Sequence, residues 1–188
     1  MKIRLAAYLQ SDSIVDGEGI RTVIWTQGCP HHCLGCHNPE TWDFDGGALV
    51  DVSEVCEIID SLEGQDGITF SGGDPFMQAK ACSEIAKYAR SKGLNIWAYT
   101  GFNYEDLIHL SEKKPEILDF LNEIDVLVDG RFILEKKSFS CVFRGSTNQR
   151  VIDVKQSLKK KKVVLIEEYV LKEKKETSNR ARQEGIFV

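Results

Sequence analysis

Three of the six cysteines lie in one short polar stretch, "GCPHHCLGCHNP", which spans residues 28–39. Their spacing is Cys29-x3-Cys33-x2-Cys36, and the stretch has neither a helical nor a strand period. Irregular backbone can aim three thiolates at one centre, which a regular helix or strand with this spacing could not do. In a reducing compartment, clustered cysteines bind metal more often than they form disulfides. The loop therefore predicts a metal centre.

Two kinds of centre are compatible with this loop. A structural zinc site wants four ligands, so His31, His32 or His37 would have to join the three thiolates. An iron–sulfur cube held by three thiolates instead leaves one iron open for a ligand that reacts. The spacing favours the cluster, and the zinc site stays open as the alternative.

The rest of the chain predicts alternating strands and helices. The expected strands are "RTVIWTQG", "GITFSGG", "LNIWAYTG" and "DVLVDGRF", and the expected helices are "DVSEVCEIIDSLE", "DPFMQAKACSEIAKYARSKG", "NYEDLIHLSEK" and "PEILDFLNEI". Such alternation is typical of an α/β fold with a parallel sheet. A closed eight-fold barrel takes about 250 residues. A chain of 188 residues is therefore expected to form an incomplete, open TIM-like βα barrel.

Four polar segments follow directly after predicted strands. They are residues 29–36, 72–75, 99–101 and 129–131. In a parallel α/β barrel all strands point the same way, so their carboxyl ends meet at one face. We expect these four segments to be neighbours and to form the functional site.

Charge divides the chain into a domain at 1–154 and a basic extension at 155–188, expected to be a helix or partly disordered. The extension holds ten Lys/Arg and five Asp/Glu, whereas the domain holds 14 and 24. An acidic domain argues against nucleic-acid binding. The chain has no apolar run of about 18 residues and no signal-peptide pattern. We therefore predict a cytoplasmic protein that binds neither nucleic acid nor membrane.

Several motifs together resemble a known family. The cysteine spacing resembles the radical S-adenosylmethionine (SAM) signature, and "DGEGIRTVIWTQGCPHHCLGCHNPETW" resembles the glycyl-radical activating enzymes. "SGGDP", "WAYTG", "DVLVDGRF" and "FRGSTNQR" are similar to the activating proteins of anaerobic ribonucleoside-triphosphate reductases. The resemblance covers roughly residues 10–152 and does not extend into the remaining tail.

The resemblance implies one [4Fe–4S] cluster per chain, with Cys29, Cys33 and Cys36 as its metal ligands and SAM as cosubstrate. A one-electron donor such as reduced flavodoxin or ferredoxin would reduce the cluster. Cleavage of SAM would then yield a radical that is passed to a glycine of the reductase. No catalytic side chain beyond the cluster ligands is expected, because the cofactor supplies the difficult chemistry.

The resemblance also suggests which residues bind SAM. Backbone at Gly35, Cys36 and His37 would contact the adenine, with Gly35 where many radical SAM enzymes have an aromatic residue. Gly72, Gly73 and Asp74 would hold the methionine ammonium. The plainer interpretation of this last segment is a tight turn with Asp74 as a helix N-cap.

Thr100, Asp129 and Arg131 are further candidates for contacts to the ribose and carboxylate of SAM. Their plainer interpretation is hydrogen bonding within turns at strand ends. Cys56 and Cys82 lie in helical patterns that predict core positions, and Cys141 has no assigned role.

Other functions remain open at this point. The chain could activate a different glycyl-radical enzyme, such as one of the formate-lyase type, or could act on a small molecule as a radical SAM enzyme. It could also be a zinc-binding adaptor without enzymatic activity. The content of iron and sulfide separates the adaptor from the enzymes.

Overall fold

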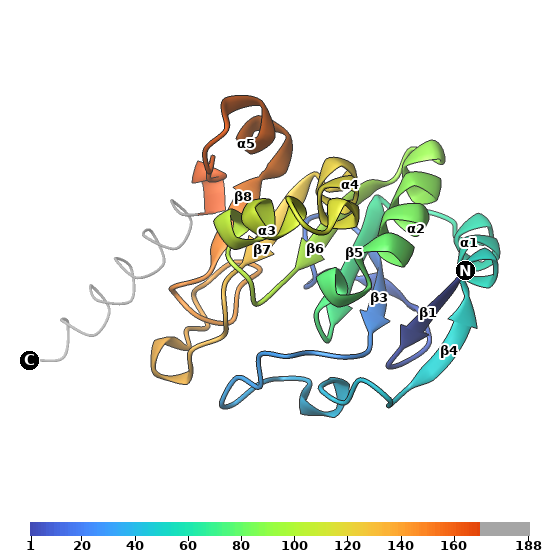
Figure 1. Ribbon diagram of the computed structural model, residues 1–188, viewed down its shortest axis with the longest axis horizontal. Coiled ribbons are helices and arrows are strands. Elements are labelled where there is room, and N and C mark those ends of the chain that lie inside the picture. Colours follow the sequence, from blue (N-terminus) through green and yellow to red (C-terminus); the bar gives the residue numbers. More distant parts are fainter. Residues whose placement is uncertain (170–188) are drawn as a thin grey trace, which may run out of the picture.

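The computed structural model describes residues 1–169 as a single sheet with helices packed against it (Figure 1). The strands are β1 (Lys2–Leu5), β2 (Gln10–Ser13), β3 (Arg21–Thr26), β4 (Ala48–Asp51), β5 (Gly67–Gly72), β6 (Asn95–Tyr99), β7 (Val126–Asp129) and β8 (Arg150–Asp153). The helices are α1 (Val52–Asp60), α2 (Ala79–Ser91), α3 (Tyr104–Ser111), α4 (Pro115–Glu123) and α5 (Val154–Lys160), with short 3-10 turns η1 (Pro39–Thr41), η2 (Pro75–Gln78) and η3 (Leu134–Lys136).

The sheet is open, with strand order β4-β1-β3-β5-β6-β7-β8 and β2 paired to β3. Its centre, β3-β5-β6-β7, is parallel. Both flanks are antiparallel: β1 pairs β3 and β4, and β8 pairs β7. The fold is therefore a mixed α/β fold, and the four strands predicted from the sequence are its parallel core.

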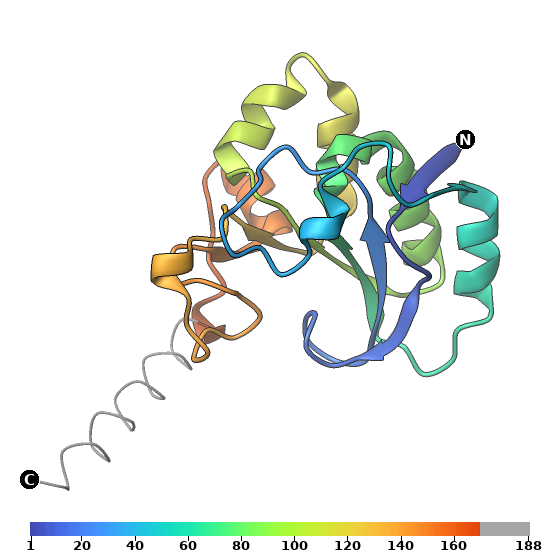
Figure 2. The same ribbon diagram turned by 90° about the horizontal axis from the view of Figure 1, so that it is seen from below.

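Apolar side chains explain why the helices cover one face of the sheet (Figures 1 and 2). In α4, Ile117, Phe120 and Leu121 are buried, and burial of each such side chain is worth about 1.5–3 kcal/mol. In α1, Val55 and Ile59 face the same core, as the helical period predicts. All four helices predicted from the sequence are present.

A smaller aromatic cluster lies apart from this helical core. Trp97 of β6 packs edge to face on Phe143 and Tyr169, with ring centroids 5.2 and 6.0 Å away. The hydroxyl of Tyr169 donates to a carboxylate oxygen of Glu18 at 2.9 Å. The chain beyond β8 therefore returns to the sheet and packs against it.

This packing bears on the extension expected at residues 155–188. Residue 154 begins α5, in which Val154 and Ser157 are buried, so residues 155–169 are integrated with the fold. Residues 170–188 lie outside the described residues, and the expectation for them stays a prediction. Within residues 1–169, no helix combines the length and apolar character needed to cross a bilayer.

Candidate metal and cofactor site

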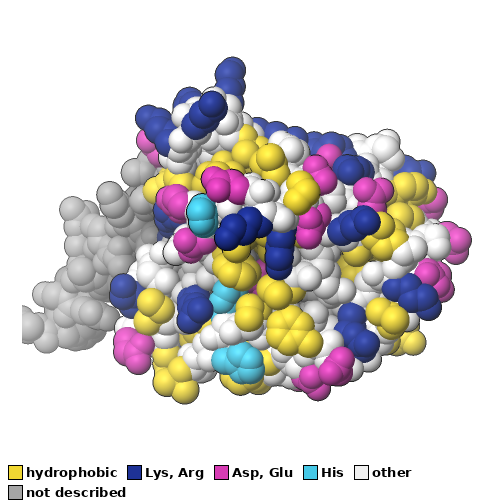
Figure 3. All heavy atoms as spheres, in the orientation of Figure 1, with side chains coloured by type: hydrophobic (Ala, Val, Ile, Leu, Met, Phe, Trp, Pro, Cys, Tyr) yellow, Lys and Arg dark blue, Asp and Glu magenta, His cyan; other side chains and the backbone are white. Residues whose placement is uncertain are grey.

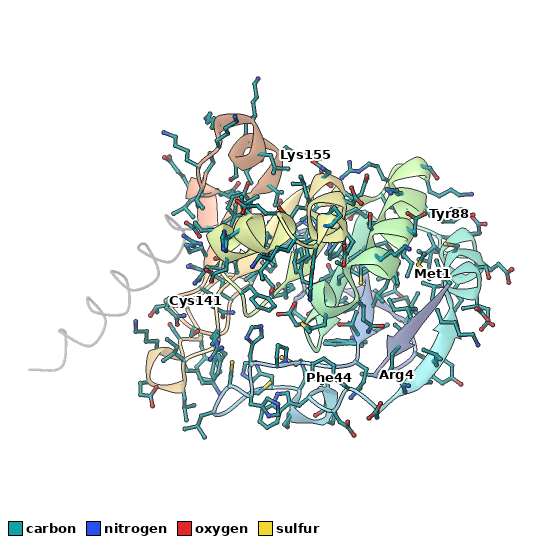
Figure 4. The ribbon with its side chains drawn as sticks, viewed as in Figure 1. Met1, Arg4, Phe44, Tyr88, Cys141 and Lys155 are labelled. Carbon is teal, nitrogen blue, oxygen red and sulfur yellow. The ribbon has the colours of Figure 1, made fainter. Side chains whose placement is uncertain are left out.

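A pocket of about 590 Å³ lies at the carboxyl ends of the parallel strands. Its lining comes from all four segments expected there, including Cys29 and Cys36, Gly72, Thr100 and Gly130. Figure 4 shows sulfur-bearing side chains between the labelled Cys141 and Phe44, and Figure 3 shows histidine and apolar side chains along the same lower part of the molecule. Segments far apart in sequence are therefore neighbours in space.

The cysteine loop leaves β3 and is fixed at both ends by backbone hydrogen bonds. Gly28 and Cys29 donate their N–H groups to the carbonyls of Thr41 and Trp42 at 2.8 and 3.1 Å. Cys36 donates to the carbonyl of Cys33 at 3.1 Å, which closes a tight turn. The three cysteines are thus held on a compact loop whose ends cannot drift apart.

Gly35 provides the backbone conformation that this turn needs. Its φ is +74°, a left-handed conformation that glycine adopts without steric cost. A Cβ at this position would lie 2.9 Å from a methyl carbon of Leu134. An aromatic side chain does not fit here without rearrangement, which accounts for the glycine before the third cysteine.

Burial raises the pKa of the Cys29 thiol to about 11 and also raises the pKa of Cys33. Opposing this, backbone N–H groups of His31 and Phe132 favour the thiolates of Cys29 and Cys33, respectively. A further N–H, from Asn38, donates to the Cys36 sulfur at 3.4 Å. Metal binding releases protons from thiols. The loop therefore supplies donors suited to sulfurs that become charged when a metal binds.

The donor set fits an iron–sulfur cluster. Cys29, Cys33 and Cys36 all line one pocket. Within residues 1–169, no three His, Cys, Asp or Glu side chains are placed to hold a single metal ion. In a four-iron cluster each protein thiolate binds a different iron, so the three sulfurs need not converge on one point.

Asp74 lies behind the pocket, fully buried, rather than in its lining. Its Oδ2 accepts from Nε2–H of His31 at 2.7 Å, from the Thr100 hydroxyl at 2.8 Å and from the Gly101 N–H at 3.0 Å. Its Oδ1 accepts from the N–H of Phe76 at 3.1 Å, as an N-cap does. The N-cap interpretation is confirmed. Four protein donors already bind this carboxylate, which favours a positioning role over direct contact with a ligand.

His31 connects this carboxylate to the cysteine loop, because it lies between Cys29 and Cys33. A Cβ at Gly101 would come within 2.3 Å of its ring, so glycine is needed for this close approach. The sequence suggested His31 only as a zinc ligand. Its bond to Asp74 could not be inferred from residues 43 positions apart.

Asp129 is also fully buried outside the pocket lining. It accepts hydrogen bonds from Nε–H of Arg150 at 2.9 Å and from the N–H of Tyr104 at 2.7 Å. Arg131 is exposed and does not line the pocket, although its charge favours the thiolate of Cys33. Of the remaining candidates for SAM binding, Gly35 is not part of the lining, whereas the others line the pocket: Cys36, His37, Gly72, Gly73 and Thr100.

The loop between β7 and β8 supplies lining residues that the sequence did not assign. Phe143, Arg144, Gly145 and Gln149 come from the "FRGSTNQR" motif, and Cys141 lies two residues before its start. The motif was recognisable as a signature. Which of its side chains turn toward the pocket depends on contacts with other loops, which no local pattern records.

Comparisons with known proteins agree with this geometry. Residues 15–152 match the family described as "4Fe-4S single cluster domain". The chain is 36% identical over 152 residues to the anaerobic ribonucleoside-triphosphate reductase-activating protein of Haemophilus influenzae, covering 76% of this chain and 94% of that one. It is 34% identical over 147 residues to the Escherichia coli protein of that name, covering 73% and 91%.

A similar match is found with the bacteriophage T4 protein of the same name, at 33% identity over 146 residues and 73% and 86% coverage. Among solved structures, QueE from Escherichia coli aligns with a TM-score of 0.45 and 14% identity over 54% of this chain and 53% of that chain. That similarity is too low to carry an argument. The sequence matches suffice: the chain belongs to the family of anaerobic ribonucleoside-triphosphate reductase-activating proteins, and its cysteine pocket lies in a 4Fe-4S single cluster domain.

Proposed function

We propose that this protein is a radical SAM activase that generates the glycyl radical of an anaerobic ribonucleoside-triphosphate reductase. Family membership supports the choice of reaction. The observation that carries it is one pocket lined both by the three clustered cysteines and by the glycines at the end of β5. Such a pocket offers room for a nucleoside cosubstrate beside a metal cluster.

The bound [4Fe–4S] cluster would supply one electron to the SAM sulfonium, whose carbon–sulfur bond breaks to give methionine and a 5′-deoxyadenosyl radical that takes an α-hydrogen from a glycine of the reductase. The protein's part is to hold and orient the reactants. Cys29, Cys33 and Cys36 would hold three irons. Asp74 and His31 would keep the cysteine loop in place throughout.

Backbone groups would do much of the SAM binding. Gly73 approaches the cysteine loop so closely that a Cβ would lie 2.5 Å from the carbonyl oxygen of Gly28. Such close packing lets a ligand contact both segments at once. We propose that Gly72 and Gly73 bind the methionine end of SAM, that backbone at residues 35–37 binds the adenine, and that Thr100 lies near the ribose.

The open sheet supports an incomplete TIM-like barrel of the radical SAM type as the detailed fold. Four parallel strands direct their carboxyl ends toward the pocket, as barrel strands do. The barrel remains open between the edge strands β4 and β8. An open wall suits a macromolecular substrate, which must bring a glycine to the cofactor and can itself exclude water from the radical.

The electron donor is the least defined partner. We propose a small one-electron carrier such as reduced flavodoxin or ferredoxin, acting in the cytoplasm without nucleic acid or membrane. An activase of the formate-lyase type is less favoured, because the relatives found carry the reductase-activating name.

The decisive experiment compares three proteins purified without oxygen and reconstituted with iron and sulfide: native, Cys29→Ala and Cys56→Ala. Cys56 is a matched control, because it lies in α1 and outside the pocket. After reduction and addition of SAM, 5′-deoxyadenosine and methionine are quantified. The electron paramagnetic resonance spectrum is recorded before and after SAM, and again after the reductase is added.

We expect about four irons per native chain, a spectrum altered by SAM, and a glycyl-radical signal on the reductase. Cys56→Ala should behave like the native protein, whereas Cys29→Ala should lose nucleoside production. A colourless native protein that holds one zinc and is inert to SAM would instead support the adaptor. SAM cleavage without radical transfer to the reductase would support another activase.

A further inference from the structure

We infer that Arg144 binds the α-carboxylate of SAM and thereby fixes the methionine end of the cosubstrate in the pocket. The inference rests on the proposed function and assigns a residue that the sequence motifs left without a role. Three features carry it: the charges of the pocket lining, the way the loop holds Arg144, and the contact of this loop with the cysteine loop.

The first feature is the scarcity of charge in the pocket. Among the described residues that line it, Arg144 is the one Arg or Lys and Asp16 is the one Asp or Glu. SAM brings a carboxylate, an ammonium and a sulfonium into this space. Burying a carboxylate without a cationic or hydrogen-bonding partner is costly. A guanidinium is the natural partner, since its planar fork matches the two carboxylate oxygens.

The second feature is the support that Gln149 gives to the loop. Its side-chain oxygen accepts from the N–H groups of Gly145 and Ser146 at 2.9 and 3.1 Å, and its amide nitrogen donates to the Gly130 carbonyl at 3.0 Å. One side chain thus closes the loop and attaches it to the end of β7. Residues in such a loop lose less conformational freedom when a ligand binds.

Arg144 itself is fixed by this arrangement. Its Nη1 donates to the backbone carbonyl of Gln149 at 2.8 Å, which helps to hold the half-buried guanidinium against its own loop. Arginine has five N–H donors, so a bond to the loop is compatible with binding a carboxylate. Pre-orientation of this kind is what a specific carboxylate site requires.

The third feature is the contact with the cysteine loop. A Cβ on Gly145 would lie 2.9 Å from the ring of Phe132 and 3.3 Å from the ring of His37. His37 directly follows Cys36 and also packs on Phe132, with ring centroids 5.1 Å apart. The residue after Arg144 therefore lies beside the residue after the third cysteine, and both line the pocket. A carboxylate held by Arg144 would lie on the side of the pocket where the cysteines are.

Arg131 is the rival that the sequence suggested, and the structure distinguishes the two arginines. Arg131 is exposed and outside the pocket lining, whereas its carbonyl accepts from the Asn148 side chain at 2.8 Å. Its backbone thus supports the same loop, while its exposed side chain lies outside the lining, where its charge favours the thiolate of Cys33 rather than entering the pocket. The two arginines, 13 residues apart, form a matched pair for mutation.

The experiment measures equilibrium binding to the cluster-loaded protein without oxygen, using SAM and decarboxylated SAM. The variants are R144Q, R144K and R131Q, and iron content is measured for each. We expect R144Q to bind SAM about 10- to 100-fold more weakly than the native protein, because a hydrogen-bonded charge partner is lost. Decarboxylated SAM should bind native and R144Q equally well. R144K should lie between, since it keeps the charge without the fork.

Equal weakening of both ligands by R144Q would overturn the inference, because it would mean that Arg144 only shapes the loop. Loss of SAM affinity in R131Q but not in R144Q would return the role to Arg131. If the native cluster-loaded protein bound no SAM at all, the proposed function would fall, and this inference with it. Native binding with an unaffected R144Q would remove the inference alone.

Discussion

Two buried aspartates, at the ends of β5 and β7, both accept several hydrogen bonds, but their donors come from different parts of the molecule. Asp74 and Asp129 are both fully buried and each follows or ends a parallel strand. Asp74 gathers donors from the cysteine loop and from the end of β6, through His31, Thr100 and Gly101. These three donors all belong to residues that line the pocket.

Asp129 instead accepts hydrogen bonds from β8 and α3, which lie outside the cysteine loop. Its partners are Arg150 at the start of the antiparallel strand β8 and the first N–H of α3, from Tyr104. Arg150 in turn reaches Glu105 at the surface with an Nη2–Oε2 distance of 2.7 Å. A buried carboxylate at a strand end therefore does not by itself mark a ligand-binding residue. The elements that its donors come from decide its role.

The largest effect is expected from removing these carboxylates. Asp74→Ala leaves four donors without an acceptor and should lower the free energy of unfolding of the cluster-free protein by about 3–5 kcal/mol. Asp129→Ala should cost less, about 2–3 kcal/mol, because Arg150 is partly exposed and keeps Glu105. Urea unfolding with a thiol reductant measures both.

Iron binding should separate the two variants more clearly than stability does. Asp74→Ala should weaken iron retention by folded protein about 10- to 100-fold, as loss of a residue that orients metal ligands usually does. Asp129→Ala should leave it near the native level, since none of its described partners lies on the cysteine loop. Equal iron retention in both variants would refute the difference drawn between the two carboxylates.

The neighbouring glycines give a second, smaller test. In Gly73→Ala the new Cβ would meet the backbone carbonyl of Gly28, 2.5 Å away, so the start of the cysteine loop must move. We expect a loss of about 1–3 kcal/mol and weaker iron binding. Gly130→Ala meets nothing closer than 3.7 Å and pays only for its φ of +95°, about 1–2 kcal/mol.

The two glycine variants should therefore differ in iron content much more than in stability. Urea unfolding and iron analysis on the same preparations provide the comparison. Should Gly130→Ala lose as much iron as Gly73→Ala, the end of β7 would support the cysteine loop as strongly as the end of β5 does.

These differences also show what the sequence can predict. Apolar runs sufficed for the four parallel strands, because each is buried and flanked by turn residues, and helical periods sufficed for α1, α2, α3 and α4. The short strands β1, β2 and β4 escaped prediction, since four residues with mixed polarity carry little periodic signal. Their pairing is decided by contacts with β3 and with one another.

The candidate site divides in the same way. The three cysteines and two glycines were predictable, because their spacing and their place after strands carry the information. The direction in which each side chain points could not be predicted from the sequence. Asp74 and Arg131 occupy the expected segments, yet Asp74 is bound by protein donors and Arg131 is exposed outside the pocket lining. Arg144 instead lines the pocket from a loop held by Gln149. Such choices depend on residues far away in sequence.

The smallest effect is expected at Glu105, the exposed residue of the Asp129 network, which consists of Asp129, Arg150 and Glu105. The hydrogen bond from Arg150 lowers the pKa of Glu105 below its ordinary value of 4.5. A carboxyl group with a lowered pKa in the folded state adds stability that is complete above pH 4.5 and is lost as pH falls through the folded pKa. Glu105→Gln should therefore be less stable than the native protein at pH 7, by less than 1 kcal/mol because the pair is exposed.

The gap between native and Glu105→Gln should close as the pH is lowered below 4.5, and 0.5 M salt at pH 7 should narrow it. Urea unfolding at stepped pH measures this. A gap that persisted in acid would mean that Glu105 acts through packing rather than charge. The ion pair joins β8 to α3 and does not contact the cysteine loop. Iron retention at pH 7 should therefore be the same in native protein and Glu105→Gln, in contrast to the loss expected for Asp74→Ala.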